Sequence, residues 1–342
     1  MAQRILNTLY VTKQEAYVHK KGDTVLVEHD GNVLLRVPLI NLGGIVCFGN
    51  VRFSPYLLGA AAKADVRISF LTENGAFLAN VLGKTSGNVL VRREQYRVAD
   101  DLRESVKVAR AIIGAKILNS RTVIRREIRE TSGNTEALEA VANVLSHRMR
   151  LLLDMGDLDQ IRGVEGDAAS NYFGVFDQMI HSDKPEFSFL ERNRRPPKDR
   201  VNALISFLYT LILHDISAAL EAHGLDPCVG FLHRDRPGRQ SLALDLLEEF
   251  RAPLADRLAL TLLNRKQLSV SNFDGDAGSQ YLLNEKGRKT VLTAYQKRKQ
   301  QMITHPFLNE KMHLGLVFHS QALLMNRWLR KDLDAYPPFI WK

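Results

Sequence analysis

Three segments of the chain carry residues whose types and spacing could do chemistry. The first segment has the sequence Glu-Gly-Asp-Ala-Ala-Ser-Asn-Tyr-Phe and starts at Glu165. We expect Glu165 to begin a helix, where small neighbouring residues would let a metal ion, a phosphate or another helix approach its carboxylate. The alternative is that Glu165 only complements the partial positive charge at a helix N-terminus.

The second segment, residues 224–239, is a loop in which His233 stands among arginines. A neutral imidazole in such a place can ligate a metal ion or contact a phosphate. The alternative is a structural or solvent-exposed histidine.

The third segment, residues 241–251, reads Ser-Leu-Ala-Leu-Asp-Leu-Leu-Glu-Glu-Phe-Arg and is expected to be a buried helix with Ser241 as its N-cap. Asp245 and Glu248 are three residues apart and share a helix face. Glu249 is four residues from Asp245, so helix spacing does not choose between the two glutamates. Buried acids are costly unless they are paired, protonated or bound to metal. The alternative is therefore a set of salt bridges to Arg251, Arg257 or Arg265.

Taken together, the three segments suggest a site for a hard divalent cation. Two or three carboxylates with one neutral histidine make an oxygen and nitrogen shell suited to Mg²⁺ or Mn²⁺. Such an ion polarises a phosphoryl oxygen and activates a hydroxyl group. The chain has 47 Lys and Arg against 38 Asp and Glu, a net charge of +9, which favours a polyanionic partner. Its two cysteines exclude a disulfide scaffold and a cysteine-rich zinc site.

The elements that must position these residues begin with a strand-rich region. Turn-forming residues separate its strands, and Asp30-Gly31 is a hairpin signal. A helix is expected over Ser54–Ala64, with Ser54 as its N-cap and Pro55 at its first position. The predicted strands are Thr8–Val11, Ala16–His19, Thr24–His29, Val33–Val37, Gly44–Phe48, Val66–Leu71 and Ala76–Val81.

From Asp100 onward the apolar residues recur at helical spacing. Residues 154–164 are expected to be a connector, residues 181–200 a long basic loop, and Pro253 a kink or a break. Strands followed by helices predict an α+β fold, with a strand-rich domain over residues 1–93 and a larger all-α catalytic domain over residues 94–342. The predicted helices are Asp100–Arg129, Leu138–Leu153, Glu165–Ile180, Val201–His223, Ser241–Asn264, Lys286–Met302 and Leu314–Asp334.

A cytoplasmic location is expected from two features. The N-terminal residues show no apolar signal-peptide core and no small-residue cleavage site. The most apolar helical stretch, Val201–Leu213, is about 13 residues long, which is too short to span a bilayer. We therefore expect a soluble protein that does not associate with a membrane.

In this order, the three segments resemble the universal CRISPR-associated integrase, the first of the Cas proteins, over the whole chain. The most specific part is the run GLDPCVGFLHRDRPGRQSLALDLLEEFR, residues 224–251. Glu165 in EGDAASNYF agrees with it, as do Pro196-Pro197 and Asn202-Ala203. The Pro-Gly-Arg sequence after His233 is most similar to the subtype I-C branch.

The resemblance implies a metal triad of Glu165, His233 and Glu248 that holds Mg²⁺ or Mn²⁺. Glu248 stands where many members have aspartate. Asp245 matches a second acid lining the site, so the implied catalytic set is Glu165, His233, Asp245 and Glu248. Asn202 and Ser206 match polar positions on the helix that faces the site. Tyr172 is expected to support the site, with a core tyrosine as the alternative.

The resemblance also implies a reaction. The 3′-hydroxyl of a short DNA duplex would attack a phosphodiester at the repeat boundary of a CRISPR array, by direct transesterification without a covalent protein intermediate. Water in place of that hydroxyl would give endonuclease activity. The alternatives are a stand-alone metal-dependent DNase or branched-DNA resolvase, and a non-catalytic DNA-binding scaffold.

Basic residues around the predicted site are expected to contact DNA phosphates and to supply affinity rather than sequence reading. A further basic group (Arg288, Lys289, Lys297, Arg298 and Lys299) is expected to be either another DNA contact or a solvated helix face. The predicted phosphate contacts are Arg192, Arg194, Arg195, Lys198, Arg234, Arg236 and Arg239.

The strand-rich domain has a role in assembly according to the resemblance. It implies a homodimer and contacts with the second universal Cas protein, with two integrase dimers flanking one partner dimer in a heterohexamer. An iron–sulfur Cas nuclease is a further partner expected in subtype I-C systems. The implied location is the cytoplasm of a prokaryote.

Overall fold

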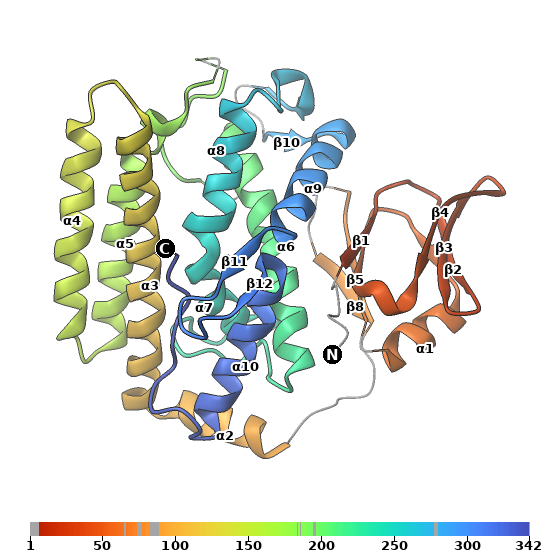
Figure 1. The fold of residues 1–342 in the computed structure, drawn as a ribbon, viewed down its shortest axis with the longest axis horizontal. Helices are drawn as coiled ribbons and strands as arrows, with labels where there is room; N and C mark the ends of the chain where they lie inside the picture. Colours follow the sequence, from red (N-terminus) through yellow and green to blue (C-terminus); the bar gives the residue numbers. More distant parts are fainter. Residues whose placement is uncertain are drawn as a thin grey trace.

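The protein has a strand-rich N-terminal unit and a larger, mostly helical remainder, seen at the right and left of Figure 1. This computed structural model describes residues 7–64, 66–73, 77–81, 89–182, 184, 186–193, 196–276 and 280–341. The arrangement confirms the α+β prediction.

Two four-stranded sheets form the N-terminal unit. The first has the order β1-β5-β7-β8, with β1, β5 and β7 parallel and β8 antiparallel. The second has the order β4-β3-β2-β6. Helix α1 (Pro55–Lys63) packs against β2 and β7. The strands are β1 (Asn7–Val11), β2 (Tyr17–Lys21), β3 (Thr24–His29), β4 (Asn32–Pro38), β5 (Leu42–Phe48), β6 (Arg52–Phe53), β7 (Arg67–Leu71) and β8 (Phe77–Val81).

Local turn chemistry accounts for this unit's most regular hairpin. Asp30 and Gly31 join β3 to β4 with φ values of 49° and 74°. Two positive φ angles are what a tight hairpin turn requires, so the predicted hairpin is confirmed. Ser54 is the N-cap of α1 as predicted, although its side chain makes no capping hydrogen bond.

Helices dominate the remainder of the chain. Two small antiparallel pairs, β9 (Phe273–Asp274) with β10 (Leu282–Leu283) and β11 (Met302–Thr304) with β12 (Lys311–His313), interrupt them, so the all-α prediction was wrong in this detail. The helices are α2 (Val89–Asp100), α3 (Leu102–Glu130), α4 (Glu136–Leu153), α5 (Leu158–Gly174), α6 (Arg200–Ala222), α7 (Ser241–Phe250), α8 (Arg257–Asn264), α9 (Glu285–Lys299) and α10 (Val317–Leu329).

Two predicted boundaries differ from the structure. Helix α2 begins at Val89 and packs on α3 and α10, so the predicted domain boundary at residues 93 and 94 falls inside a helix. Helix α5 begins at Leu158, because the Asp157 side chain caps it by accepting hydrogen bonds from the next backbone amides. The predicted connector is therefore confirmed over residues 154–157 but wrong over residues 158–164, and Glu165 lies in the middle of α5.

Pro253 changes the backbone as predicted. A π-helical segment, Arg251–Asp256, separates α7 from α8 and contains this proline. A proline inside a helix removes one backbone hydrogen bond and clashes with the preceding turn, and a π-bulge relieves both. The N-cap of α7 is Gln240 rather than Ser241, which is the first residue of the helix and is fully buried.

Helix α6 runs through the core of the helical unit. It has 23 residues, longer than the apolar stretch recognised in the sequence, and by length and composition it could cross a membrane. Within the protein, 72% of its most apolar window is buried. Core helices meet the same criterion, and α6 packs against α7, α8 and α10. After its end Gly224 has a φ of 75°, the left-handed conformation that glycine readily adopts just beyond the last turn of a helix.

Buried charges join the two units. Arg67 of β7 pairs with Glu221 of α6 at 2.9 Å. Lys299 of α9 donates to Asp215 at 2.8 Å and to the Thr8 hydroxyl at 3.0 Å. These contacts hold the first sheet against α6 and α9.

Candidate active site

Glu165 and Glu248 converge on one buried cation, the ammonium of Lys116. Lys116 lies in α3, Glu165 in α5 and Glu248 in α7. The Lys116 Nζ atom forms an ion pair with Glu165 Oε1 and lies 2.7 Å from Glu248 Oε2. Since α3 packs on both α5 and α7, helix packing brings together carboxylates that are 83 positions apart in the sequence.

Glu248 is the most strongly charge-stabilised acid of this cluster. It is 4% exposed, and Arg251 Nε lies 2.8 Å from its Oε2 atom. Burial opposes its ionisation, but Arg251, Lys116 and His233 outweigh burial and hold the pKa of Glu248 well below its usual range. Glu248 is therefore an anion throughout the neutral pH range. The salt bridge to Arg251 is one of those considered from spacing alone.

His233 is oriented by Asp245. Its Nδ1 atom lies 2.6 Å from Asp245 Oδ1, and its Nε2 atom lies 4.0 Å from Glu248 Oε1. A hydrogen bond from Nδ1–H to a carboxylate leaves the Nε2 lone pair available on the side of Glu248. A carboxylate behind a histidine is the usual arrangement for a metal-ligating imidazole.

The loop that carries His233 is wrapped around the Asp245 carboxylate. Asp245 is fully buried and accepts hydrogen bonds from the backbone amides of Phe231 at 2.6 Å and of Leu232 and His233 at 3.0 Å. These donors occupy both of its oxygens. In the structure Asp245 therefore holds the histidine loop, and its expected role as a catalytic acid lining the site stays a prediction.

Two further groups secure the same loop. Arg162 of α5 donates to the Leu232 carbonyl from Nε at 3.0 Å and from Nη2 at 2.6 Å. Gly230 packs so closely that a Cβ atom there would lie 2.7 Å from Asp245 Oδ2 and 2.7 Å from the backbone of Ser241. Only a residue without a side chain fits at this position.

Glu249 is not placed as the third ligand of a metal ion, because its carboxylate points to a different set of partners. Its carboxylate accepts hydrogen bonds from Tyr336 Oη at 2.7 Å, the Phe339 amide at 2.8 Å and Gln321 Nε2 at 3.0 Å. These partners belong to α10 and the C-terminal segment, whereas the described ion pairs of Lys116 are with Glu165 and Glu248. Burial raises the pKa of Glu249 to about 7.

The donor chemistry fits a hard divalent cation, but the described side chains surround a lysine instead. Among the residues the structure describes, no three His, Cys, Asp or Glu side chains stand close enough to form a metal cluster. The Lys116 ammonium occupies the space between Glu165 and Glu248, where two carboxylates attract a positive charge. Glu165, Glu248 and His233 Nε2 are the groups that would hold a cation there.

Asn202 and Ser206, which were expected to support the site, have no described contact with Glu165, His233 or Glu248. They are linked to this cluster through contacts with Arg192 and Tyr209. Asn202 is fully buried and, with Ser206, accepts hydrogen bonds from Arg192. The Arg192 guanidinium lies 5.4 Å from the Tyr209 ring centre, and that of Arg251 lies 4.4 Å from it. Asn202 and Ser206 are thus connected to Glu248 only by a chain of contacts through Arg192, Tyr209 and Arg251, and their supporting role stays a prediction.

Tyr172 belongs to the core. It is 3% exposed and packs edge-on against Phe173 and Phe176, with ring centres 5.1 and 5.9 Å apart. Burial and the nearby Asp256 carboxylate raise the pKa of its hydroxyl. This is the alternative of a core tyrosine that the sequence left open.

The predicted phosphate contacts fall into different environments. Arg192 is tied to α6 by the hydrogen bonds described above. Arg234 is exposed and lies 2.9 Å from Asp159, while Lys198 and Arg236 are exposed and Arg239 is half-buried. Arg194 and Arg195 lie outside the described residues. Phosphate binding by this set stays a prediction.

Comparison with known proteins identifies the family. The model of the family described as CRISPR associated protein Cas1 matches residues 9–297. The chain belongs to the Cas1 family. It is 50% identical over 339 residues to a CRISPR-associated endonuclease Cas1 of Chlorobaculum tepidum, which covers 98% of this chain and 99% of that protein. It is 33% identical over 335 residues to a fusion of the exonuclease Cas4 with the endonuclease Cas1 from Geobacter sulfurreducens, covering 97% of this chain and 60% of the fusion.

Solved structures share the fold at lower identity. A Cas1 protein from Thermotoga maritima matches with a TM-score of 0.80 at 21% identity, over 95% of this chain and 97% of that one. A casposase bound to an integration product matches with a TM-score of 0.84 at 20% identity, over 98% of this chain and 95% of that one. A chain of a Cas6-RT-Cas1–Cas2 complex matches with a TM-score of 0.83 at 18% identity, over 100% of this chain and 37% of that one.

Two residues of the site were missed by reasoning from the sequence. Lys116 lies on the face of α3 that also carries the buried Ile112, Ile113 and Ile117. A lysine on such an apolar face must find a buried anion, and this signal could have identified it. Tyr209, on the apolar helix α6, offered no comparable signal.

Proposed function

We propose that this Cas1 family member is a metal-dependent DNA integrase and endonuclease of CRISPR adaptation. The observation that carries the proposal is the convergence of Glu165 and Glu248 on the Lys116 ammonium, with the oriented His233 Nε2 4.0 Å from Glu248. Mg²⁺ or Mn²⁺ bound there would supply electrophilic stabilisation of a phosphodiester. The curated relatives are named endonucleases, which agrees with a phosphodiester substrate.

The proposed reaction is a direct transesterification. The 3′-oxygen of the incoming DNA forms a bond to phosphorus as the bond to the leaving 3′-oxygen of the target strand breaks. The proton lost by the attacking hydroxyl is balanced by the proton that the leaving oxygen gains. Water as the attacking group gives hydrolysis instead.

The residues of the chain have separate tasks in this reaction. Glu165, His233 and Glu248 hold the cation, and Asp245 keeps the His233 Nε2 lone pair turned toward Glu248. Arg251 maintains Glu248 as an anion. Arg234, Arg236 and Lys198, all exposed, are available to bind phosphates beside this cluster.

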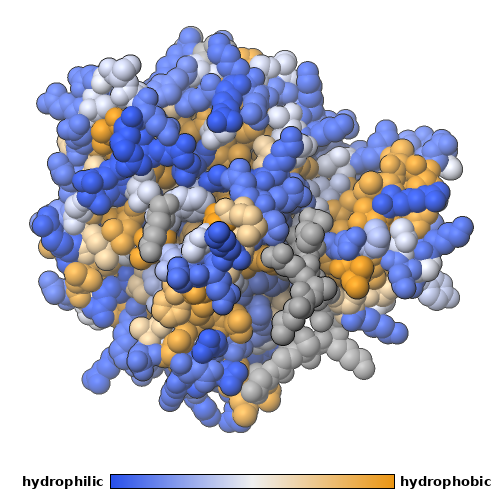
Figure 2. Space-filling model, viewed as in Figure 1, coloured by the Kyte–Doolittle hydropathy of each residue, from blue (hydrophilic) through white to orange (hydrophobic). Residues whose placement is uncertain are grey.

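The proposed assembly follows from the family and from one surface. Figure 2 shows hydrophobic residues gathered over the N-terminal unit, at the right of the view. Leu34, Leu35 and Ile40, in and after β4, are 53%, 42% and 73% exposed. An exposed apolar edge strand is suited to pairing with a second copy. We propose a homodimer through this unit, which joins the second universal Cas protein in a heterohexamer.

A further partner is proposed from a relative of the chain. The Cas4–Cas1 fusion of Geobacter sulfurreducens supports a Cas exonuclease as a further partner, consistent with the iron–sulfur nuclease expected from the resemblance. The subtype I-C branch and a location in the prokaryotic cytoplasm stay predictions from the sequence.

Strand transfer in vitro tests the proposed function. Wild type, Glu165→Gln and Asp167→Asn would receive a labelled duplex and a plasmid with a CRISPR repeat, together with the small Cas partner and Mg²⁺, Mn²⁺ or EDTA. Asp167 is the matched control, since it lies two residues away in α5 but pairs with Arg148 at 2.6 Å. We expect joined product from wild type and Asp167→Asn with metal, and at least about 100-fold less from Glu165→Gln, because a lost ligand costs more than a lost supporting group.

The outcomes separate the alternatives. Metal-dependent cutting without joining would favour the stand-alone nuclease or resolvase. Equal products from wild type and Glu165→Gln would mean that Glu165 is structural and that the site is misplaced. Joined or cut DNA formed by the wild type in EDTA would exclude a requirement for a divalent metal ion.

A further inference from the structure

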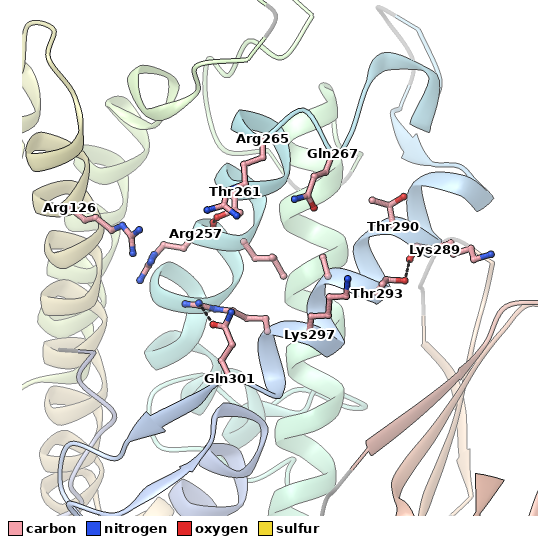
Figure 3. A pocket seen from close by; sticks show the side chains of 13 residues that line it. Arg126, Arg257, Thr261, Arg265, Gln267, Lys289, Thr290, Thr293, Lys297 and Gln301 are labelled. Atoms are coloured by element: carbon pink, nitrogen blue, oxygen red, sulfur yellow. Dashed lines mark hydrogen bonds between the residues drawn. The ribbon is translucent and has the colours of Figure 1, made fainter. Parts of the chain in front are cut away.

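A groove lined by cations lies between α8 and α9, with α3 at one end (Figure 3). Its volume is about 630 Å³. The remaining polar lining consists of threonine hydroxyls and glutamine amides, and within the described part of the chain no carboxylate lines it. Six cationic side chains line the groove: Arg126, Arg257, Arg265, Lys289, Lys297 and Arg298.

The five basic residues expected to form either a DNA contact or a solvated helix face, Arg288 to Lys299, lie in different environments in the structure. Arg288 and Lys299 are buried, and they bind the Leu283 carbonyl and Asp215 respectively. Lys289 and Lys297 are exposed at the rim of the groove. The group is therefore neither one DNA-binding face nor one solvated face.

No carboxylate is among the described lining residues of the groove, although Glu127 and Glu130 line the adjoining pocket that shares Arg126, Arg257 and Arg265 with it. Arg126 has a counter-ion in Glu130, 2.7 Å away, outside the lining. Arg298 is partly buried, and its Nη2 atom has no hydrogen-bond partner among the described residues. Burial and the nearby charge of Arg126 lower the pKa of Arg298. An anion in the groove would relieve the repulsion between Arg298 and Arg126.

The groove is separate from the site around Glu248. The guanidinium groups of Arg257 and Arg298 lie 5.7 and 5.2 Å from the ring centre of Trp341. Trp341 donates its backbone amide to Asn119, and the neighbouring Phe339 donates to Glu249. The groove thus adjoins the C-terminal segment, and none of its described lining residues is Lys116, Glu165, His233 or Glu248.

We propose that this groove is a second nucleic-acid site, which binds the phosphate backbone of a DNA strand apart from the metal-binding cluster. The proposal rests on the proposed function for the identity of the nucleic acid as DNA. The cations are spread over three helices and open to solvent at Lys289, Lys297 and Arg265, as an extended polyanion requires. No aromatic ring is among the described lining residues, and Arg257 and Arg298 already lie against the adjoining Trp341 ring, so the lining favours a phosphate backbone over a stacked base.

The test compares two variants that lose the same charge. Lys289→Gln/Lys297→Gln removes two exposed lysines from the rim. Lys286→Gln/Lys311→Gln removes two exposed lysines that do not line the groove, one of them also in α9. Binding of a labelled duplex is measured by fluorescence anisotropy in EDTA over a salt series, with circular dichroism as a check on folding.

The expected result is a change in the salt dependence. Each lost phosphate contact lowers the slope of log affinity against log salt by about 0.9, so the groove variant should lose about 1.8 in slope. Across the tenfold interval from 1 M to 0.1 M salt, this corresponds to an affinity loss of up to about 60-fold at 0.1 M. The control variant should retain the wild-type slope.

Three results would overturn the proposal. Equal loss in both variants would mean that only net charge matters. No loss in either variant would mean that DNA does not touch the groove. Thermal unfolding with and without pyrophosphate is measured on the same variants. If DNA binding is unchanged and only the groove variant is no longer stabilised by pyrophosphate, the groove binds a small phosphate ligand instead of DNA.

This measurement is independent of strand transfer, because EDTA excludes metal-dependent chemistry. A failed integration assay with the expected slope change would overturn the proposed reaction and support the groove. Successful integration with no slope change would support the proposed reaction and overturn the DNA-binding role of the groove.

Discussion

Replacing Asp245 with asparagine should separate the role of holding a histidine from that of binding a metal. The change preserves the volume of the side chain but leaves it one acceptor oxygen in place of two. Asp245 accepts four hydrogen bonds in the structure, from three backbone amides and from His233 Nδ1. If the amide oxygen replaces Oδ2, the new NH₂ group faces the backbone amide and Nδ1 of His233.

The magnitude follows from this arrangement. One buried backbone donor loses its acceptor, which costs about 1–3 kcal/mol, so the free energy of unfolding should fall by about 2 kcal/mol. His233 Nδ1 must become an acceptor, which moves the ring proton to Nε2 and removes the lone pair that faces Glu248. Loss of a carboxylate behind a ligating histidine lowers metal affinity by about 10–100-fold.

Two assays measure these effects. Urea unfolding in EDTA gives the change in stability, and calorimetric titration with Mn²⁺ gives the metal affinity. Asp235→Asn is the matched control, because Asp235 is an exposed aspartate in the same loop. If Asp245→Asn unfolds like wild type and binds Mn²⁺ equally well, Asp245 does not set the tautomer of His233 and this reasoning fails.

Two further predictions concern the His233 loop and the interface between the units. Gly230→Ala should lower the free energy of unfolding, measured in urea, by about 1–3 kcal/mol, because the new Cβ would overlap Asp245 and the backbone of Ser241. The control Gly163→Ala places its Cβ in open space on α5 and should not destabilise the protein. Equal effects of the two substitutions would contradict the close packing at Gly230. Burial and the charge of Arg67 lower the pKa of His214 to about 4. In the unfolded chain the histidine pKa is near 6.5, so as the pH falls the unfolded state is protonated at His214 before the folded state is. The free energy of unfolding should therefore fall by about 3 kcal/mol between pH about 6.5 and pH about 4. His214→Gln should lose this part of the pH dependence in urea unfolding, whereas the exposed His147→Gln should retain it.

Local rules account for much of the fold. The Asp30-Gly31 turn, the Pro55 start of α1, the Gly224 end of α6 and the break at Pro253 each depend on a residue's own backbone preferences. Such preferences act over a few positions and can be read from the sequence. The start of α5 was mispredicted because Asp157 competes with later residues as the cap.

The ligand types of the candidate site were also present in the sequence. Glu165, His233 and Glu248 were named from residue type and family resemblance, and the spacing of Asp245 and Glu248 placed both on one face of α7. Helix periodicity could not choose between Glu248 and Glu249. The choice depends on what packs on each side of α7.

The sequence by itself determined the strand-rich and helical regions, the excess of positive charge and the residue types of the site. Tertiary structure alone decided that Lys116 lies between Glu165 and Glu248, that Asp245 holds a loop, and that two residues of a five-residue basic group are buried while the other three line a groove. The physical reason is that periodicity fixes which residues share a face of one helix. Which faces meet depends on the packing of α3, α5 and α7, and this packing sets the burial and the partner of every charge.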